Sequence, residues 1–404
     1  MQASDLAQRV RQAMEMHRQG RFNEAKAVYE QVLKQQPDYF DALYLLGTLQ
    51  AQCGQDQSAI AIFQQALKIN PRHSGTYNNL GNVWLKQQRF EEALQHYLKA
   101  LELKPDFVEA LNNKGNALLK LGRYEEALPC FDEVLKRQPA LAEAYNNRGI
   151  ALKELRRYVE ALASYDQALA LKPDYAQAHS NRGNALQKLE RFEESLLAYA
   201  QALKVDPNHF DAYYNQANAF QELKRFDQAL ASFDQAIALQ PANPQAHWNK
   251  ALALLIQGDF AAGWEQYEWR WQNNPVSPQR QFRQPLWTGG EGRGQTLLLH
   301  SEQGIGDVIQ FASLLPEVLA TGIQVIFQTD ARLIPLFQRA WPTVGFITNE
   351  QDTEGLAFDV HCPIGSLGRI YRNSLAAFEG QTGAYLQADP ERVKSLQAAH
   401  GSPT

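Results

Sequence analysis

VEALNNKGNALLKLGRYEEALPCFDEVLKRQPAL, residues 108–141, is one unit of a pattern that repeats every 34 residues along about two thirds of the chain. Each unit is predicted to be a pair of helices closed by a proline, and this proline recurs at constant spacing. The eight positions are Pro37, Pro71, Pro105, Pro139, Pro173, Pro207, Pro241 and Pro275. Proline stops a helix because it lacks an N–H and has a fixed φ. The spacing therefore predicts a mostly α-helical solenoid of eight 34-residue repeats over residues 6–277.

Two columns of the repeat explain how its helices pack. Positions are counted from 1 to 34, and the repeats start at residues 6, 40, 74, 108, 142, 176, 210 and 244. Position 8 is always glycine or alanine, whereas position 24 is always aromatic, as in Gly115 and Phe131. Small residues facing large ones are expected where two helices cross closely and interdigitate. These columns specify the fold rather than the function.

With this period and these columns, residues 6–277 resemble the tetratricopeptide repeat (TPR) family. The resemblance implies a right-handed superhelix whose first helices line a groove. Such grooves commonly bind an extended peptide or a helix of a partner protein.

One polar column is not explained by core packing, because the last six repeats all carry asparagine at position 6. Four of these repeats have a second asparagine at position 9, on the same helix face. The candidate peptide-binding residues are Asn79, Asn82, Asn113, Asn116, Asn147, Asn181, Asn184, Asn215, Asn218 and Asn249. Either these amides pair with the backbone of an extended peptide, or they bond between neighbouring repeats. The first alternative resembles the asparagine ladder of the O-linked N-acetylglucosamine transferase.

Position 7 carries basic residues beside this column. They are Lys114, Arg148, Arg182 and Lys250, and they are expected to add positive charge at the margin of the groove. The first two repeats interrupt the asparagine column with Arg11 and Leu45. Binding is therefore expected to centre on repeats three to eight.

The composition changes after the eighth repeat. GWEQYEWRW (263–271) concentrates tryptophans that either stack on a sugar ring or, as we favour, seal the end of the solenoid. A linker rich in proline, glycine and arginine covers 278–294, and residues 391–404 are expected to be a truncated tail. Between them, over 295–390, strand and helix patterns alternate, as in TLLLH (296–300) and QVIFQTD (324–330). This alternation predicts a partial Rossmann-like lobe with a parallel sheet.

The segment HSEQGIGDVIQFASLLPEV (300–318) resembles the start of the glycosyltransferase family that includes bacterial heptosyltransferases, the family 9 type with a two-lobed GT-B fold. The resemblance spans about residues 285–390 and extends to bacterial proteins that fuse TPR repeats to this lobe. It implies Asp307 as the general base, Glu302 as a second candidate, and Gly304 and Gly306 as the substrate loop. Spacing alone gives another interpretation, because Asp307 and Gln310 also form a capping box at a helix start.

Members of that family bind the nucleotide sugar mainly through a second lobe, for which the residues before GSPT (401–404) leave no room. We therefore expect a protein- or peptide-binding scaffold joined to an incomplete glycosyltransferase-like lobe, inactive as this chain alone. The alternative is an active glycosyltransferase that transfers sugar from a nucleotide sugar to a bound protein or glycan acceptor. Its donor lobe would then be missing from this chain or supplied in trans.

Composition restricts the remaining classes. The 39 basic and 44 acidic residues give a net charge of -5, which argues against broad nucleic-acid binding. The three cysteines are far apart, so no disulfide framework is expected, and His361 and Cys362 are expected to be buried packing groups rather than metal ligands. The sequence shows no signal-peptide core and no membrane span. We expect a cytoplasmic protein without a cofactor or metal.

Overall fold

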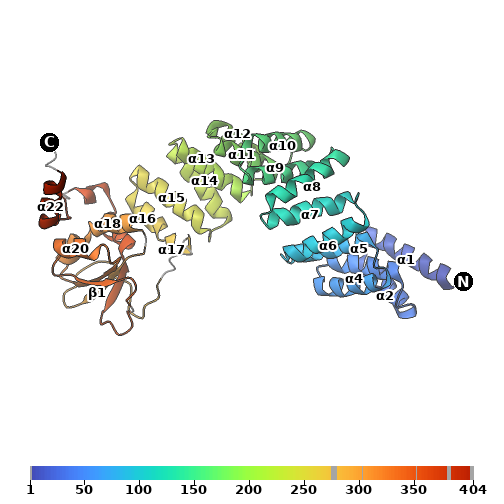
Figure 1. Ribbon diagram of the computed structural model, residues 1–404, viewed down its shortest axis with the longest axis horizontal. Coiled ribbons are helices and arrows are strands. Elements are labelled where there is room, and N and C mark those ends of the chain that lie inside the picture. The colour runs from blue at the N-terminus through green and yellow to red at the C-terminus, as the bar shows by residue number, and fades with distance from the viewer. Residues whose placement is uncertain (1, 274–279, 303, 352, 380–383, 401–404) are drawn as a thin grey trace. The chain divides into compact units, whose positions relative to one another are not determined.

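A computed structural model describes residues 2–273, 280–302, 304–351, 353–379 and 384–400 (Figure 1). The chain divides into two compact units, Met1–His209 and Phe210–Thr404, which are described separately. This division falls at the boundary between the sixth and seventh predicted repeats. Pro275, the last proline of the series, lies outside the described residues.

The first unit consists of helix pairs, one pair for each predicted repeat. The first helices are α1 (Gln2–Arg18), α3 (Phe40–Gln52), α5 (Ser74–Lys86), α7 (Val108–Lys120), α9 (Ala142–Glu154) and α11 (Ala176–Lys188). The second helices are α2 (Phe22–Gln35), α4 (Asp56–Ile69), α6 (Phe90–Leu103), α8 (Tyr124–Arg137), α10 (Tyr158–Leu171) and α12 (Phe192–Val205). These pairs confirm the predicted helical repeat.

The small and aromatic columns meet inside each pair. A Cβ added to Gly81 would lie 2.6 Å from the ring of Tyr97, and one added to Gly115 would lie 2.7 Å from Phe131. Both rings are fully buried. Position 8 is therefore restricted to small residues where the first helix crosses the aromatic ring of the second, as the sequence predicts.

The second unit begins with the last two repeats. Their helices are α13 (Phe210–Glu222), α14 (Phe226–Leu239), α15 (Pro244–Gln257) and α16 (Phe260–Tyr267). Helix α16 has 8 residues, whereas α14 has 14. A separate short helix, α17 (Arg270–Asn273), follows it. The eighth repeat thus departs from the others because its second helix ends at Tyr267.

A four-stranded sheet completes the second unit. Its strands are β1 (Thr296–His300), β2 (Gln324–Thr329), β3 (Gly345–Thr348) and β4 (Val360–Pro363). The strand order is β3-β2-β1-β4, and all the pairings are parallel. In the register of the sheet, Leu298 lies opposite both Ile326 and His361. The predicted parallel sheet after the solenoid is therefore confirmed.

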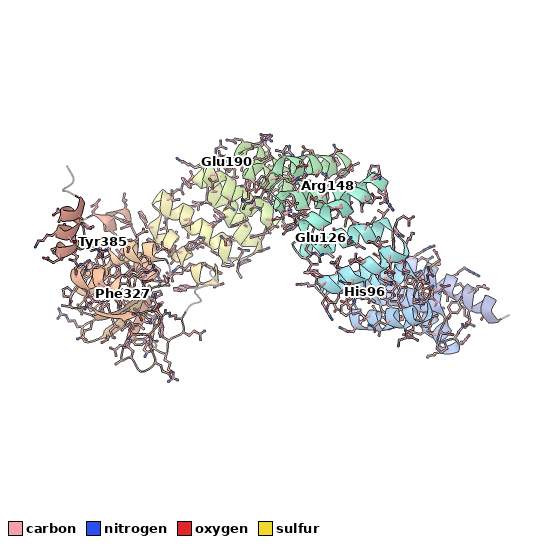
Figure 2. All side chains as sticks on the ribbon, in the orientation of Figure 1. His96, Glu126, Arg148, Glu190, Phe327 and Tyr385 are labelled. Atoms are coloured by element: carbon pink, nitrogen blue, oxygen red, sulfur yellow. The ribbon has the colours of Figure 1, made fainter. Side chains whose placement is uncertain are left out.

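Helical segments accompany the strands and enclose one core. They are α18 (Ile305–Ala312), α19 (Leu315–Ala320), α20 (Ile334–Ala340), η1 (Ile364–Ser366), α21 (Leu367–Tyr371), η2 (Leu375–Phe378) and α22 (Pro390–His400). Leu299, Phe327 and Phe337 are fully buried in this core, and Figure 2 labels Phe327 on the sheet. Tyr267 of the eighth repeat belongs to the same core, so repeat and sheet pack together within this unit.

Part of the segment predicted as a linker packs against β4. The Trp287 side chain is 5% exposed, and its backbone N–H donates to the His361 carbonyl at 2.7 Å.

None of the described helices has the length and apolar character needed to cross a membrane.

Candidate functional site

The asparagines at position 6 bond across the boundary between neighbouring repeats. Asn113 donates through Nδ2 to Oδ1 of Asn82 at 2.9 Å and to Oδ1 of Asn78 at 3.1 Å, both in the preceding repeat. Equivalent bonds run from Asn79 to Thr48, from Asn147 to Asn116, from Asn181 to Asn146 and from Asn249 to Asn218. The alternative in which the amides join neighbouring repeats is therefore confirmed. Peptide binding by these residues stays a prediction.

Position 9 supplies the main acceptor for these bonds, and it also accepts from position 24. Asn82 Oδ1 accepts from the Tyr97 hydroxyl at 2.8 Å, and Asn184 Oδ1 accepts from Tyr199 at 2.7 Å. The sequence reasoning missed this tyrosine partner, although the two columns were visible. Asn215, at position 6 of α13, is half-buried.

The basic residues at position 7 form ion pairs, so the expectation of free positive charge at the groove margin is wrong for three of the four. Each of the three pairs with an aspartate at position 25 of the preceding repeat. The pairs are Arg148 with Asp132 at 2.7 Å, Arg182 with Asp166 at 2.7 Å, and Lys250 with Asp234 at 2.5 Å. Figure 2 labels Arg148. Lys114 lies beside the thiol of Cys130 instead.

A cavity of about 420 Å³ lies in the first unit, among repeats three to five. Leu119, Tyr124 and Ile150 provide apolar lining. The polar lining is Asn116, Lys120, Asn147 and Glu154. Two of the candidate peptide-binding asparagines, Asn116 and Asn147, therefore border a space that is open to solvent and large enough for a side chain of a ligand.

Asp307 lies on the surface of the second unit. Helix α18 begins at Ile305 with Gly304 at its N-cap, so the prediction that Asp307 caps the helix is wrong. Asp307 is the third helical residue and is exposed, where a carboxylate interacts favourably with the helix dipole. Gly306, predicted as part of a substrate loop, is instead the second residue of helix α18, and a Cβ added to it would meet no atom within 4 Å. The role of Asp307 as a base stays a prediction.

Glu302, directly after β1, is buried at the carboxyl edge of the sheet. Its side chain is 3% exposed. Its Oε1 accepts from Arg270 Nη2 at 2.8 Å and from the backbone N–H of Gly365 at 3.1 Å. Its Oε2 is buried without a hydrogen-bond partner in the described part of the chain. Burial raises the pKa of Glu302 to about 7, although Arg270 acts to lower it.

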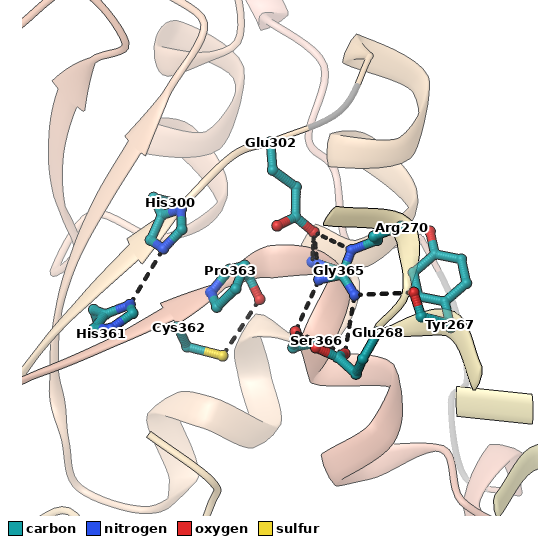
Figure 3. A network of polar contacts seen from close by, with 10 residues as sticks. All are labelled: Tyr267, Glu268, Arg270, His300, Glu302, His361, Cys362, Pro363, Gly365 and Ser366. Atoms are coloured by element: carbon teal, nitrogen blue, oxygen red, sulfur yellow. Dashed lines mark hydrogen bonds and ion pairs between the residues drawn. The ribbon is translucent and has the colours of Figure 1, made fainter. Parts of the chain in front are cut away.

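Arg270 connects the eighth repeat to this edge (Figure 3). Besides Glu302, its guanidinium donates to Ser366 Oγ at 2.8 Å and to Glu268 Oε1 at 2.9 Å. A single guanidinium thus lies against two carboxylates, and the negative charge of Glu268 favours the protonated form of Glu302. Because Glu302 follows β1 and Gly365 follows β4, the cluster lies where the strand order reverses. Open parallel sheets bind ligands at such positions.

Sequence reasoning named Glu302 but missed Arg270, Gly365 and Ser366 as its partners. A signal existed for Arg270, because the other repeats hold alanine or valine at its position, position 27. Gly365 has no comparable signal. Only the structure shows that a Cβ there would collide with Glu302 Oε1.

The tryptophan cluster packs against the lobe. The Trp264 indole donates to the Arg372 carbonyl at 2.7 Å, and its ring covers Gly368. Trp269 stacks on His247 with ring centroids 3.9 Å apart. The sealing interpretation is therefore confirmed for Trp264. His361 and Cys362 are buried, as expected for packing groups.

Comparison with known families identifies the repeats. Models described as tetratricopeptide repeat or TPR repeat match residues 16–81, 85–122, 112–176, 176–209 and 214–268. The protein FlbA of Caulobacter vibrioides is 32% identical over 163 residues, and the match covers 36% of this chain. The same match covers 27% of FlbA, so the chain spans only this part of the length of that relative.

Two solved structures with TM-scores of 0.50 and 0.51 show the same fold. The Cut9-Hcn1 hetero-tetramer of the APC/C is 16% identical with a TM-score of 0.51, covering 66% of this chain and 52% of that chain. A tetratricopeptide repeat protein from Parabacteroides merdae is 16% identical with a TM-score of 0.50, covering 62% and 99%. YrrB, described as a TPR protein with an unusual peptide-binding site, is 28% identical with a TM-score of 0.39, covering 46% and 97%.

Proposed function

We propose that this chain, which belongs to the tetratricopeptide repeat family, is a scaffold that holds an extended peptide or partner segment against repeats three to five. The supporting observation is the cavity of about 420 Å³ that is lined by both apolar groups and asparagine amides. Asn116 uses its Oδ1 to accept from Asn147, whereas its Nδ2 has no hydrogen bond among the described residues. This free donor is available for the carbonyl of a peptide backbone.

We place the scaffold in the cytoplasm, since its three cysteines are free thiols in the structure. The resemblance of the asparagine column to that of O-linked N-acetylglucosamine transferase is part of the same proposal. In this chain the amides would serve twice. The bonded atoms join the repeats, and the unbonded Nδ2 donors of position 9 asparagines such as Asn116 contact the ligand.

Selection of a peptide display library on the full chain tests the proposal. Lys120→Glu, at the cavity, is expected to weaken the selected peptides. Lys188→Glu occupies the same repeat position and is also exposed, but it lies outside the cavity lining and is expected to have no effect. Enrichment of no peptide, or equal effects of the two substitutions, would contradict binding at this cavity.

The second candidate function is glycosyl transfer by the lobe over residues 295–390, which we propose to be of the heptosyltransferase-like, Rossmann-type class. The strand order β3-β2-β1-β4 supports this class, because doubly wound nucleotide-binding sheets begin in that order. The open space beside Gly306, in the first turn of α18, and the exposed Asp307 next to it also support this class. In this proposal the acceptor hydroxyl loses its proton to Asp307 while its oxygen displaces the nucleotide from the sugar carbon.

Incubation of the full chain with a panel of nucleotide sugars and the selected peptides tests this second function. Release of nucleoside diphosphate that is lost in Asp307→Asn would support transfer. Turnover that persists in Asp307→Asn would exclude this residue as the base. Absence of turnover with every donor would leave the scaffold as the function of this chain.

A further inference from the structure

We propose that the interruption of the asparagine column at Ile150 forms a specificity pocket for one large apolar side chain of the bound peptide. The inference rests on the peptide-binding function proposed above and names the class of peptide. Leucine, isoleucine, methionine and phenylalanine are the side chains that fit its chemistry.

The first argument is a departure from the rule that governs position 9. Asparagine at this position, as in Asn82, accepts from the tyrosine of its own repeat and from the next repeat. The Ile150 side chain offers no acceptor to the tyrosine of its own repeat or to the asparagine of the next repeat. The Tyr165 hydroxyl is consequently buried without a hydrogen-bond partner in the described residues, and Asn181 bonds to Asn146 instead. The Tyr29 hydroxyl is likewise buried without a partner among the described residues, with Met14 at position 9 of its repeat. What distinguishes Ile150 is its place on the cavity.

The second argument is where this departure lies. Ile150 borders the cavity, where it meets Leu119 and Tyr124 to form an apolar lining. An asparagine at 150 would place an amide on this wall, and burying an apolar ligand group against it would leave the amide unsatisfied. The isoleucine therefore makes the cavity suitable for an apolar side chain.

The third argument concerns the rest of the ligand. Asn116 Nδ2 is a free donor on the same cavity, so it can hold the peptide backbone next to the inserted side chain. Lys120 and Glu154 both line the cavity, so its charged groups are of opposite sign and favour neither an acidic nor a basic peptide residue. The apolar lining and the Asn116 donor therefore carry the specificity.

Parallel library selection on the wild-type chain and on Ile150→Asn tests the inference. The wild type should enrich peptides with a large apolar residue at one position. Ile150→Asn should bind those peptides at least about ten-fold more weakly. Its thermal midpoint should not fall, because the new amide supplies the missing acceptor for Tyr165. Ile150→Ser, which shortens the same wall, is a second variant in case the asparagine disturbs folding.

Tyr165→Phe is the matched control, since it removes the unpaired hydroxyl without changing the cavity lining, and it should leave affinity unchanged. Peptides that show no apolar preference, or that bind both position 150 variants as tightly as the wild type, would overturn the inference while leaving the scaffold function intact. Failure to enrich any peptide would overturn both.

Discussion

A single side chain at position 9 determines whether the tyrosine hydroxyl at position 24 of the same repeat finds a hydrogen-bond acceptor. Where it is asparagine, as at Asn82 and Asn184, the tyrosine of the same repeat is satisfied. Where it is Ile150, Tyr165 is not satisfied. An unpaired buried hydroxyl costs about 1–3 kcal/mol, so this difference is large enough to measure.

Tyr165→Phe is therefore expected to raise the free energy of unfolding by about 1 kcal/mol, because it removes a buried hydroxyl that has no partner. Tyr199→Phe is its matched counterpart at the same repeat position. It should lower the free energy of unfolding by about 1 kcal/mol, because Asn184 loses a donor. Urea denaturation followed by circular dichroism measures both changes. Changes of the same sign would contradict the hydrogen-bond assignment.

Glu302 makes stability depend on pH. Its pKa in the folded chain, about 7, lies above the ordinary value of 4.5. The folded chain therefore holds this proton more tightly than the unfolded chain. The resulting stability is complete below about pH 4.5 and is lost as pH rises through about 7, by an amount on the order of 2–3 kcal/mol.

Glu302→Gln does not titrate at this position. Its free energy of unfolding should therefore lack the part of the decline between pH 5 and pH 8 that Glu302 causes. Glu265→Gln, at an exposed site nearby, should keep the full decline. Tryptophan fluorescence during urea unfolding is a suitable measurement, because all the tryptophans except Trp84 follow residue 209. A wild-type chain and a Glu302→Gln chain with parallel pH profiles would show that the carboxyl group titrates normally.

At the scale of elements, the turn between the two helices of a repeat depends on one left-handed residue at position 15. Gly20, Gly54 and Gly122 adopt φ of 75°, 77° and 72° there. Three other repeats of the first unit have Gln88, Arg156 and Glu190 at the same place, with φ of 60°, 59° and 57°. A residue with a Cβ pays about 1–2 kcal/mol for this conformation.

Replacing Gln88, Arg156 or Glu190 by glycine should raise stability by roughly 0.5 kcal/mol each, since the relief of strain exceeds the added entropy of the unfolded chain. The reverse substitution, Gly122→Ala, should lower stability by about 1 kcal/mol. Thermal unfolding of the three single variants and the triple variant measures the effect. A triple variant that melts below the wild type would contradict the strain at these turns.

The helix pairs could be predicted from sequence because the residues that pack together, such as Gly115 and Phe131, stand at fixed positions of the same repeat. The bonding of the asparagines could not be decided, since both hypotheses use the same helix face. The bond from Asn113 to Asn82 joins residues 31 positions apart. The asparagines at position 9 were the available signal in the sequence for bonding between neighbouring repeats. The structure shows this bonding.

At the scale of the whole chain, the two units carry different chemistry. The first holds an amide-lined cavity and the second holds a buried acid at the edge of a parallel sheet. The parallel sheet could be predicted from alternating strands and helices. The contact between Arg270 and Glu302 could not, because it joins a unique eighth repeat to a loop and has no periodic counterpart. Asp307, predicted from its motif, lies exposed in the first turn of helix α18, beside the open space at Gly306.

Hydrogen–deuterium exchange of the full chain, with and without a selected peptide, tests the central claim most directly. The scaffold proposal predicts slower exchange in 116–124 and 147–154, the segments that line the cavity, and unchanged exchange over 296–378. Protection confined to 296–378, or no protection of the cavity segments at saturating peptide, would contradict binding in repeats three to five.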